Sequence, residues 1–389
     1  MKCDTYCLGD VCTFIDYRGK TPPKTTSGIP LVTAKIVKNG MIQEPQEFIA
    51  ENYYDEWMRR GIPKKGSVVF TTEAPLGEVA RIRTDDKLAF AQRIIVLEPK
   101  IKQLSADYLF YALQDRVLKG RIEARSTGTT VIGIKAAELK KVEIDLPSLA
   151  EQEKIAAILC SLDDKIELNN KINENLERQA QAIYKSWFVD LEPFDGVKPD
   201  SWKTADIYSL ANIIYGAPFA SKKFNTEGIG KPIIRIRDLK DQQFATYTTE
   251  QHPKGYLLQP GDIIAGMDGE FRPYIWGNDE AWLNQRICVF SNKRPNGKAF
   301  LYHILKPLLY AVEQTQVATT VIHIGKKDFD AFRITLPDTK TLDSFDALTS
   351  PMIKQIVSNY FENKRLAALR NALLPKLMSG EIDVEDVNI

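Results

Sequence analysis

TVIGIKAAELKKVEIDLP at residues 130–147 and TVIHIGKKDFDAFRITLP at residues 320–337 align without a gap, at an offset of 190 residues. The same offset continues downstream, where it pairs Asn169 with Asn359. Upstream the offset grows, so that KGSVVF matches PGDIIA at an offset of 195. Offsets that drift in one direction through small loop insertions indicate a tandem duplication.

Each repeat consists of a globular block of about 150 residues and a helix of about 40. Short apolar strands such as IPLVTA, SVVFTT and RIIVLEP are separated by Gly/Pro turns, with one or two helices such as residues 106–122. The sequence therefore predicts an α+β fold with two globular domains, each followed by a long helix. The predicted division is 1–149 for the first domain, 150–189 for the central helix, 190–202 for a linker, 203–340 for the second domain, 341–378 for the C-terminal helix and 379–389 for a tail.

The two helical segments have a seven-residue repeat of apolar positions, with asparagine near the middle of each. A buried seam asparagine fixes the register of paired helices, so two helices with polar centres should pair centre to centre. Equivalent helices of a duplicated chain would then form an antiparallel coiled coil with pseudo-twofold symmetry. The predicted pairing residues are Leu162, Ile166, Asn169, Asn173, Leu176, Ile183, Met352, Ile356, Asn359, Asn363, Leu366 and Leu373. The alternative is two unrelated surface helices with solvated asparagines.

The composition is that of an ordinary globular protein, with a net charge of +1, 44% hydrophobic residues and 26% charged residues. Basic residues are in excess in the first block and acidic residues in the first helix. The apolar runs are far shorter than a membrane span and the first residues have no apolar signal core, so we expect a cytoplasmic protein. The five cysteines fit a reducing compartment, and the spacing of Cys3, Cys7 and Cys12 matches no zinc pattern, so no metal site is expected.

Several strings, taken together, resemble the specificity subunits of type I restriction-modification systems over essentially the whole chain. They are YCLGDVCTFIDYRGKTPP at 6–23, LPSLAEQEKIAAIL with DDKIELNNKINENLERQAQAIYKSWF at 146–188, KPDSW at the start of the second block, and LRNALLPKLMSGEI at 369–382. The resemblance implies a bacterial defence protein with two target-recognition domains, each reading half of a split DNA site. It also implies that the helices act as a spacer and dock two methyltransferase subunits, which a restriction and translocation subunit joins. The second helix departs from the pattern, because it opens with TKTLDSFDAL in place of LAEQEKI.

Enzyme signatures are missing or weak. The sequence has no glycine-rich cofactor loop with an NPPY-like tetrapeptide, as a methyltransferase needs, and no GxxxxGKS/T loop for ATP. Asp85 with Glu98-Pro99-Lys100 imitates a nuclease site, but a strand that ends in a turn explains it better. We therefore expect a non-catalytic chain without cofactors of its own, with S-adenosylmethionine, ATP and Mg²⁺ bound by partner subunits.

Base reading uses Arg or Lys for guanine, Asn or Gln for adenine and carboxylates for cytosine, while hydroxyl groups and main-chain amides contact phosphates. Loops rich in these residue types are the predicted DNA-binding sites. In the first block they are Arg18, Lys20, Thr21, Lys24, Lys35, Lys38, Thr71, Thr72, Glu73, Arg125, Ser126, Thr127, Thr129 and Thr130. In the second block they are Lys222, Lys223, Arg235, Arg237, Lys240, Asp268, Glu270, Arg272, Tyr274, Gln316, Thr319 and Thr320.

One dipeptide is the same in both repeats: Gln92-Arg93 matches Gln285-Arg286 at an offset of 193. Residues that read different half-sites should differ, so we expect this pair to have a shared structural role.

Two other functions remain open from the sequence alone. One is a free-standing two-domain DNA-binding scaffold or regulator. The other is an enzyme that modifies or cleaves DNA by itself, which the missing motifs argue against.

Overall fold

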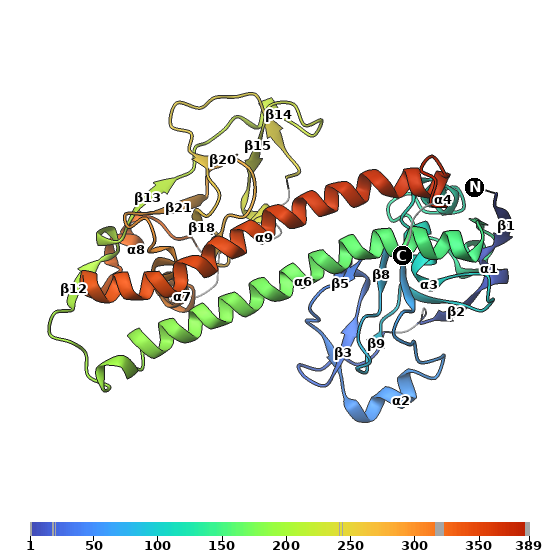
Figure 1. Ribbon diagram of the computed structural model, residues 1–389, viewed down its shortest axis with the longest axis horizontal. Helices are drawn as coiled ribbons and strands as arrows, with labels where there is room; N and C mark the ends of the chain where they lie inside the picture. The colour runs from blue at the N-terminus through green and yellow to red at the C-terminus, as the bar shows by residue number, and fades with distance from the viewer. Residues whose placement is uncertain are drawn as a thin grey trace. The chain divides into compact units, whose positions relative to one another are not determined.

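The computed structural model describes residues 2–17, 19, 21–240, 242, 244–315 and 323–385. The chain divides into two compact units. The first unit contains Met1–Asp164 and Leu366–Ile389, and the second contains Lys165–Arg365 (Figure 1). Every helix within the described ranges is too short or too polar to cross a lipid bilayer.

The first unit combines small sheets with short helices and parts of two long ones. Its strands are β1 (Asp4–Cys7), β2 (Cys12–Asp16), β3 (Ile29–Val32), β4 (Val37–Lys38), β5 (Met41–Ile42), β6 (Phe48–Ile49), β7 (Val68–Thr72), β8 (Leu76–Arg81), β9 (Ala89–Phe90), β10 (Ile94–Pro99) and β11 (Glu143–Leu146). Its short helices are α1 (Leu8–Val11), α2 (Tyr54–Trp57), α3 (Ala106–Ala112), α4 (Arg116–Glu123) and α5 (Ala136–Leu139), with 3₁₀ turns η1 (Ala34–Ile36) and η2 (Glu51–Tyr53).

An antiparallel sheet in the order β2-β10-β7-β8 forms the middle of the first unit. Both of its faces are covered, which explains the continuous apolar runs of β7 and β10. Ile95 and Leu97 of β10 pack against the helices, whereas Ile94 and Val96 pack against the layer that contains β3 and β9. The two-residue alternation of a strand thus divides its side chains between two cores.

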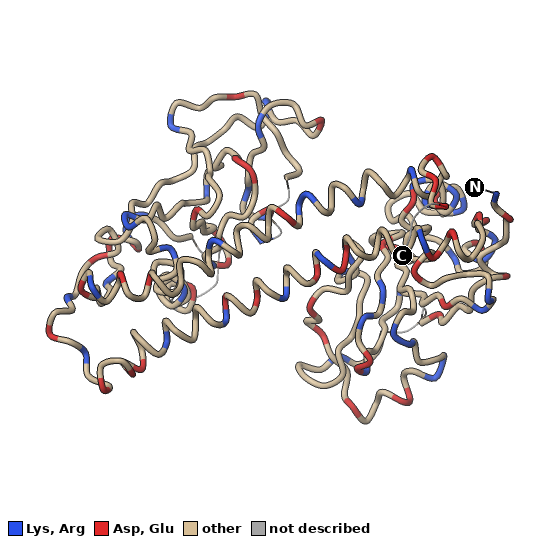
Figure 2. Tube along the Cα trace, viewed as in Figure 1, with Lys and Arg blue, Asp and Glu red and all other residues tan. Residues whose placement is uncertain are grey.

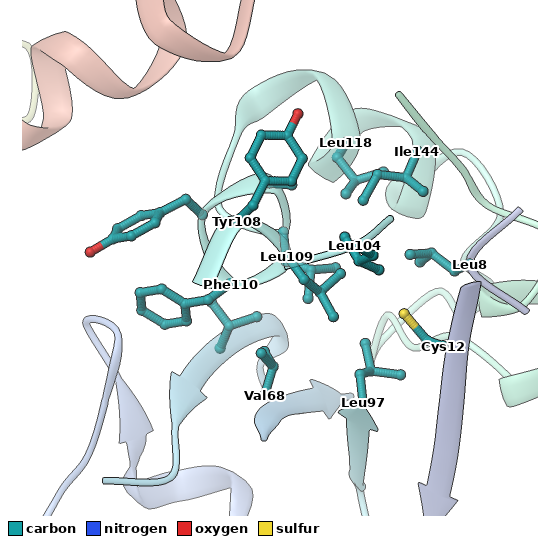
Figure 3. Close-up of a cluster of buried hydrophobic side chains, with 14 of the residues drawn as sticks. Leu8, Cys12, Val68, Leu97, Leu104, Tyr108, Leu109, Phe110, Leu118 and Ile144 are labelled. Carbon is teal, nitrogen blue, oxygen red and sulfur yellow. The ribbon is translucent and has the colours of Figure 1, made fainter. Parts of the chain in front are cut away.

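The helical core is built on α3, whose five residues from Tyr108 to Ala112 are all buried. Figure 3 shows Leu109 and Phe110 of α3 close to Val68 and Leu97 of the sheet. The stretch 106–122 forms two helices, because the side chain of Asp115 accepts a hydrogen bond from the Val117 amide and caps a new helix.

The second unit has its own sheets. Its strands are β12 (Lys203–Asp206), β13 (Ala211–Tyr215), β14 (Phe224–Asn225), β15 (Lys231–Ile234), β16 (Tyr247–Thr248), β17 (Leu257–Leu258), β18 (Ile263–Gly266), β19 (Pro273–Ile275), β20 (Ala281–Leu283), β21 (Ile287–Asn292) and β22 (Arg333–Leu336). Its shorter helices are α7 (Lys298–Thr315) and α8 (Lys326–Ala331), with 3₁₀ turns η3 (Glu192–Phe194), η4 (Ile207–Ser209), η5 (Ser221–Lys223) and η6 (Ile236–Asp238).

The sheet topology of the first unit is repeated in the second. The order β13-β21-β18-β19 corresponds to β2-β10-β7-β8, and the pair β12-β22 corresponds to β1-β11. A parallel pair occurs at the same place in each unit, β3 with β9 and β15 with β20. The duplication predicted from the sequence therefore extends to strand order.

The two long helices are α6 (Leu149–Phe188) and α9 (Thr339–Ser379). Ser148 and Glu151 form a reciprocal capping box at the start of α6. Asp338, at the equivalent position before α9, accepts a hydrogen bond from the Thr341 amide at 2.9 Å. The second helix therefore begins at a comparable cap although its opening sequence is different.

Within the second unit, α6 and α9 contact each other through asparagine side chains. Asn169 donates to Asn363 at 2.9 Å, and Asn359 donates to Asn173 at 2.7 Å. In these contacts the residue number rises along α6 as it falls along α9. Asn169, Asn173 and Asn359 are all buried.

The remaining predicted pairing residues lie in different surroundings. Leu176, Ile183 and Ile356 pack into the core of the second unit, and Leu373 packs against the core of the first. Leu162, Ile166, Met352 and Leu366 are half-buried.

Candidate nucleic-acid interface

The matched Gln-Arg dipeptides occupy equivalent turns in the two units. Arg93 follows β9 and precedes β10, and Arg286 follows β20 and precedes β21. Both arginines have a left-handed backbone, with φ of 75° for Arg93 and 71° for Arg286. The Arg93 carbonyl accepts a hydrogen bond from the Thr72 amide at 2.9 Å, and the Arg286 carbonyl accepts one from Met267 at 2.8 Å. The expected shared structural role of the dipeptides is thus a turn that ties two strands together.

Each arginine side chain also contacts an acid at the end of the neighbouring strand. Arg93 Nε lies 2.6 Å from Glu73 Oε1, and Arg286 Nη1 lies 3.4 Å from Asp268 Oδ1. These are surface pairs, because the two arginine side chains are 45% and 54% exposed. An ion pair of this exposure contributes about 0–1 kcal/mol, whereas a left-handed backbone costs a residue with a Cβ roughly 1–2 kcal/mol. Stability alone therefore favours glycine over arginine at both positions.

A second segment meets each turn. In the first unit Gly133 forms isolated bridges with Glu73 and Thr127, and in the second His323 forms one with Asp268. The His323 Nδ1 atom lies 2.6 Å from Asp268 Oδ1 and 3.1 Å from Arg286 Nη1. The structure thus brings Glu73 close to the 125–130 segment, although these two predicted regions are far apart in sequence.

A surface pocket of about 350 Å³ lies at this place in the first unit. Its polar lining includes Glu73, Gln92, Arg93, Thr127 and Lys135. Gly19 also lines it, between the predicted residues Arg18 and Lys20. Two cations, an amide and a hydroxyl group are the donors that proteins use to contact a nucleic-acid backbone.

Most predicted DNA-binding residues lie on the surface of their unit. The exposed ones are Thr21, Lys24, Lys35, Lys38, Arg125, Thr127, Thr129, Thr130, Lys222, Lys223, Arg237, Lys240 and Glu270. Glu73, Ser126, Arg235, Asp268, Arg272 and Tyr274 are half-buried. Arg18, Lys20, Gln316, Thr319 and Thr320 lie outside the described residues.

Two of the predicted residues are not available as surface groups. Thr71 and Thr72 are 0% and 2% exposed in β7. The Thr71 hydroxyl accepts a hydrogen bond from the Glu78 amide at 2.9 Å, inside the sheet. Both residues end the predicted strand SVVFTT, and residue type alone predicts DNA contacts for their hydroxyl groups, whereas the strand lies in the buried centre of the sheet.

Two exposed cations occupy equivalent positions. Lys35 lies in η1 directly after β3, and Arg237 lies in η6 directly after β15. Arg237 Nε is 3.8 Å from Asp238, so its charge is only loosely paired.

Several other candidate cations are paired with acids. Arg272 forms an ion pair with Glu313, and hydrogen bonding to that arginine lowers the pKa of Glu313. The hydrogen bond from the Ala220 amide lowers the pKa of Glu250, which pairs with Lys223 at 3.2 Å. Lys and Arg are interspersed with Asp and Glu along the traces of both units (Figure 2), which is consistent with the net charge of +1. Such a surface favours weak, salt-sensitive binding of DNA over strong nonspecific binding.

The residues that resembled metal or nuclease sites have structural partners. Asp85 pairs with Lys65, and Glu98 accepts a hydrogen bond from Ser67 at 2.5 Å. Burial raises the pKa of the Cys12 thiol to about 12, which keeps it protonated. Over the described part of the chain, no group of three His, Cys, Asp or Glu side chains could hold a metal ion.

The sequence did not predict that Lys135 lies beside Arg93 or that His323 lies beside Arg286. It assigned Arg93 and Arg286 a structural role only. The identity of the Gln-Arg dipeptides was the available signal. The left-handed backbone and the pairing with an acid are visible only in the folded chain.

Comparison with known proteins shows the family of the chain. The family model described as "Type I restriction modification DNA specificity domain" matches residues 2–178 and again residues 199–359. The MjaIX type I restriction enzyme specificity subunit of Methanocaldococcus jannaschii is 28% identical, over 92% of this chain and 88% of the relative. The HindI specificity subunit of Haemophilus influenzae is 24% identical, over 82% of this chain and 87% of the relative.

A solved structure has the same fold. The S subunit of a type I restriction-modification system from M. genitalium superposes with a TM-score of 0.55, covering 97% of this chain and 96% of that one, at 16% sequence identity. Two matches to the family model that together cover most of the chain establish that it belongs to the type I restriction-modification specificity family, as a non-catalytic DNA-recognition subunit with two recognition domains.

Proposed function

We propose that the chain reads a bipartite DNA sequence, with one half read by the domain at 1–149 and the other by the domain at 203–340. The observation that carries this proposal is the repeated sheet topology of the two units. Two copies of one scaffold with different surface loops are suited to binding two different short sequences, because loops on a rigid scaffold carry specificity.

The proposed DNA surface of each domain comprises the predicted residues that are exposed or half-buried, without Thr71 and Thr72. Half-buried members such as Arg235 and Arg272 already have acidic partners, so they would exchange these contacts when DNA binds. Exposed members such as Lys35, Lys38 and Arg237 would contact phosphates first.

We infer that the predicted helical segments 150–189 and 341–378, which contain most of α6 and α9, form an antiparallel coiled coil with pseudo-twofold symmetry. The bonded asparagine pairs of the second unit support this arrangement, since matching polar seam residues fix the register of paired helices. Residues 190–202 then serve as the linker between repeats and 379–389 as the tail.

We further propose that the helices dock two methyltransferase subunits, and through them the restriction subunits. S-adenosylmethionine, ATP and Mg²⁺ belong to those partners. The purified chain alone should therefore neither methylate nor cleave DNA.

The test is to express the chain together with the methyltransferase subunits of its own system, in a host that lacks adenine methylation. Sequencing that detects methylated bases should reveal one split motif with an adenine in each half. Methylation of an uninterrupted motif, or methyl transfer by the lone chain, would contradict the proposal.

A domain exchange separates the two halves. Replacing residues 1–149 with the equivalent block of a relative should change one half of the motif and leave the other half intact. Replacing residues 203–340 is the matched control and should change the opposite half. If either exchange alters both halves, the domains do not read independently.

A further inference from the structure

We propose that Arg93 and Arg286 are a matched pair of phosphate anchors, one in each recognition domain, which hold the DNA backbone independently of its sequence. This inference rests on the proposed reading of a bipartite DNA sequence, and it assigns one task, phosphate binding, to Arg93 and Arg286. It goes beyond the structural role that the sequence suggested for the Gln-Arg dipeptides.

The backbone conformation at both positions is unfavourable for arginine. Both arginines are left-handed, with φ of 75° and 71°. Glycine and asparagine adopt this conformation more easily than arginine. The turn itself is held by main-chain hydrogen bonds to Thr72 and Met267, which any residue can make. An arginine at both positions therefore indicates a task for the side chain.

The side chains of both arginines contact acidic residues. Glu73 contacts the Nε atom of Arg93 at 2.6 Å, and among the described residues no other side chain is seen to engage its outer nitrogens. A guanidinium group held by one edge can present a fork of N–H donors to a phosphate. In the second unit Asp268 Oδ1 and His323 Nδ1 both contact Nη1 of Arg286, at 3.4 Å and 3.1 Å. This guanidinium group is therefore held through one outer nitrogen, and its side chain remains 54% exposed.

Arg93 lies among other hydrogen-bond donors. Its pocket of about 350 Å³ is also lined by Lys135, Thr127 and Gln92. This set of donors fits a phosphodiester better than a base edge, because cations and hydroxyl groups dominate contacts to the backbone.

The same residue type, arginine, occupies this position in both repeats. Domains that read different half-sites must differ at the residues that discriminate bases. A residue shared by both can supply only what the two half-sites have in common. Every duplex has phosphates at regular spacing, so a shared anchor fits them.

The test uses the full chain and a fluorescent random-sequence duplex, with binding measured from low to moderate salt. Arg93→Gly and Arg286→Gly remove the side chain and accept the left-handed backbone. Each should reduce the slope of log affinity against log salt by about 0.9, and the double variant by about 1.8. Thermal unfolding should occur at the same or a higher temperature, because glycine relieves the backbone.

Two controls make the result specific. Arg178→Ala removes a 77% exposed arginine of α6 and should leave the slope unchanged. Arg93→Lys keeps a positive charge and should retain most of the slope while losing part of the affinity.

A selection from a random duplex pool then separates phosphate contact from base reading. The Arg93→Gly variant should recover the same sequence preference as the unaltered chain. Loss of preference at a single base position would overturn the inference and make Arg93 a base reader. An unchanged slope with a lower unfolding temperature would overturn it in favour of a structural ion pair. If the unaltered chain selects no split sequence, the proposed function fails, while the salt slopes still decide the role of the arginines.

Discussion

The contact between Asn173 and Asn359 offers a direct test of how α6 and α9 are held together. These side chains are 6% and 3% exposed, and their hydrogen bond is 2.7 Å long. Asn173→Leu leaves the Asn359 amide without this partner in a buried place. Asn359→Leu does the same to Asn173 and also removes the acceptor of Gln355. The double leucine variant removes both polar groups together.

The expected magnitudes follow from this geometry. Each single substitution leaves a buried polar group unsatisfied, at a cost of about 1–3 kcal/mol in the free energy of unfolding. A cost of about 2 kcal/mol lowers the melting temperature of a unit of this size by roughly 4–8 °C. In the double variant leucine packs on leucine, so its stability should equal or exceed that of the original chain. Its helices should be less strictly fixed in register.

The assay is a double-mutant cycle, measured by urea unfolding and followed by circular dichroism. Hydrogen exchange over residues 165–188 and 339–365 would show that the change lies in the paired helices. Asn175→Leu, on an exposed position of α6, is the control and should shift stability by no more than about 0.5 kcal/mol. If the two single effects simply add in the double variant, within about 0.5 kcal/mol, the two asparagines do not act as a pair and the prediction is refuted.

Three further predictions concern other parts of the chain. Burial lowers the pKa of His303 to about 4, and the unfolded value is near 6.5. The unfolded chain therefore binds more protons than the folded chain as pH falls from about 6.5 to 4. Because of this one site, the free energy of unfolding should decrease by about 3 kcal/mol over that interval. Unfolding measured at several pH values should show His303→Phe losing this component, and an identical pH dependence in both proteins would contradict the assignment. Phe345 is fully buried and lies 4.9 Å from Phe188, centroid to centroid. Phe345→Ala should cost about 3–5 kcal/mol in denaturant unfolding, whereas Leu348→Ala, at a 50% exposed position, should cost little; equal effects would refute this. Inserting one heptad after Asn173 and another after Asn363 adds about 10 Å to each helix and should lengthen the unread gap of the target by up to about three base pairs. An unchanged gap in the methylation motif, with full activity, would mean that the helices do not measure DNA.

The duplicated architecture could be predicted because the two repeats retain the same residues at matched positions. The gapless match of 130–147 with 320–337 indicated two copies of one fold, and the heptads indicated two long helices. Strand order could not be predicted from the sequence, because β7 and β10 are buried on both faces. Their continuous apolar runs do not indicate which strands lie beside them. Only the folded chain shows that Ile95 and Ile94 belong to different cores.

The candidate site could be predicted only by residue type. Loops rich in Lys, Arg and Thr include exposed residues such as Lys35, but also the buried Thr71. Sequence patterns do not separate a hydroxyl group that faces solvent from one that bonds inside a sheet. The bridge between Glu73 and Gly133 joins segments about 60 residues apart, and the local sequence of neither segment predicts this contact.

The first unit is assembled from two stretches of chain that are made at different times. Leu377 and Val384 are 1% and 3% exposed within the core that also contains Leu8 and Val68. On the ribosome, the first globular block has emerged long before these closing residues are synthesised. Until then its core remains open to solvent, and the nascent protein is exposed to chaperones and proteases. A message cut short before residue 366 should therefore impair the block that was translated first, so that truncated products are degraded rather than accumulating as stable half-proteins.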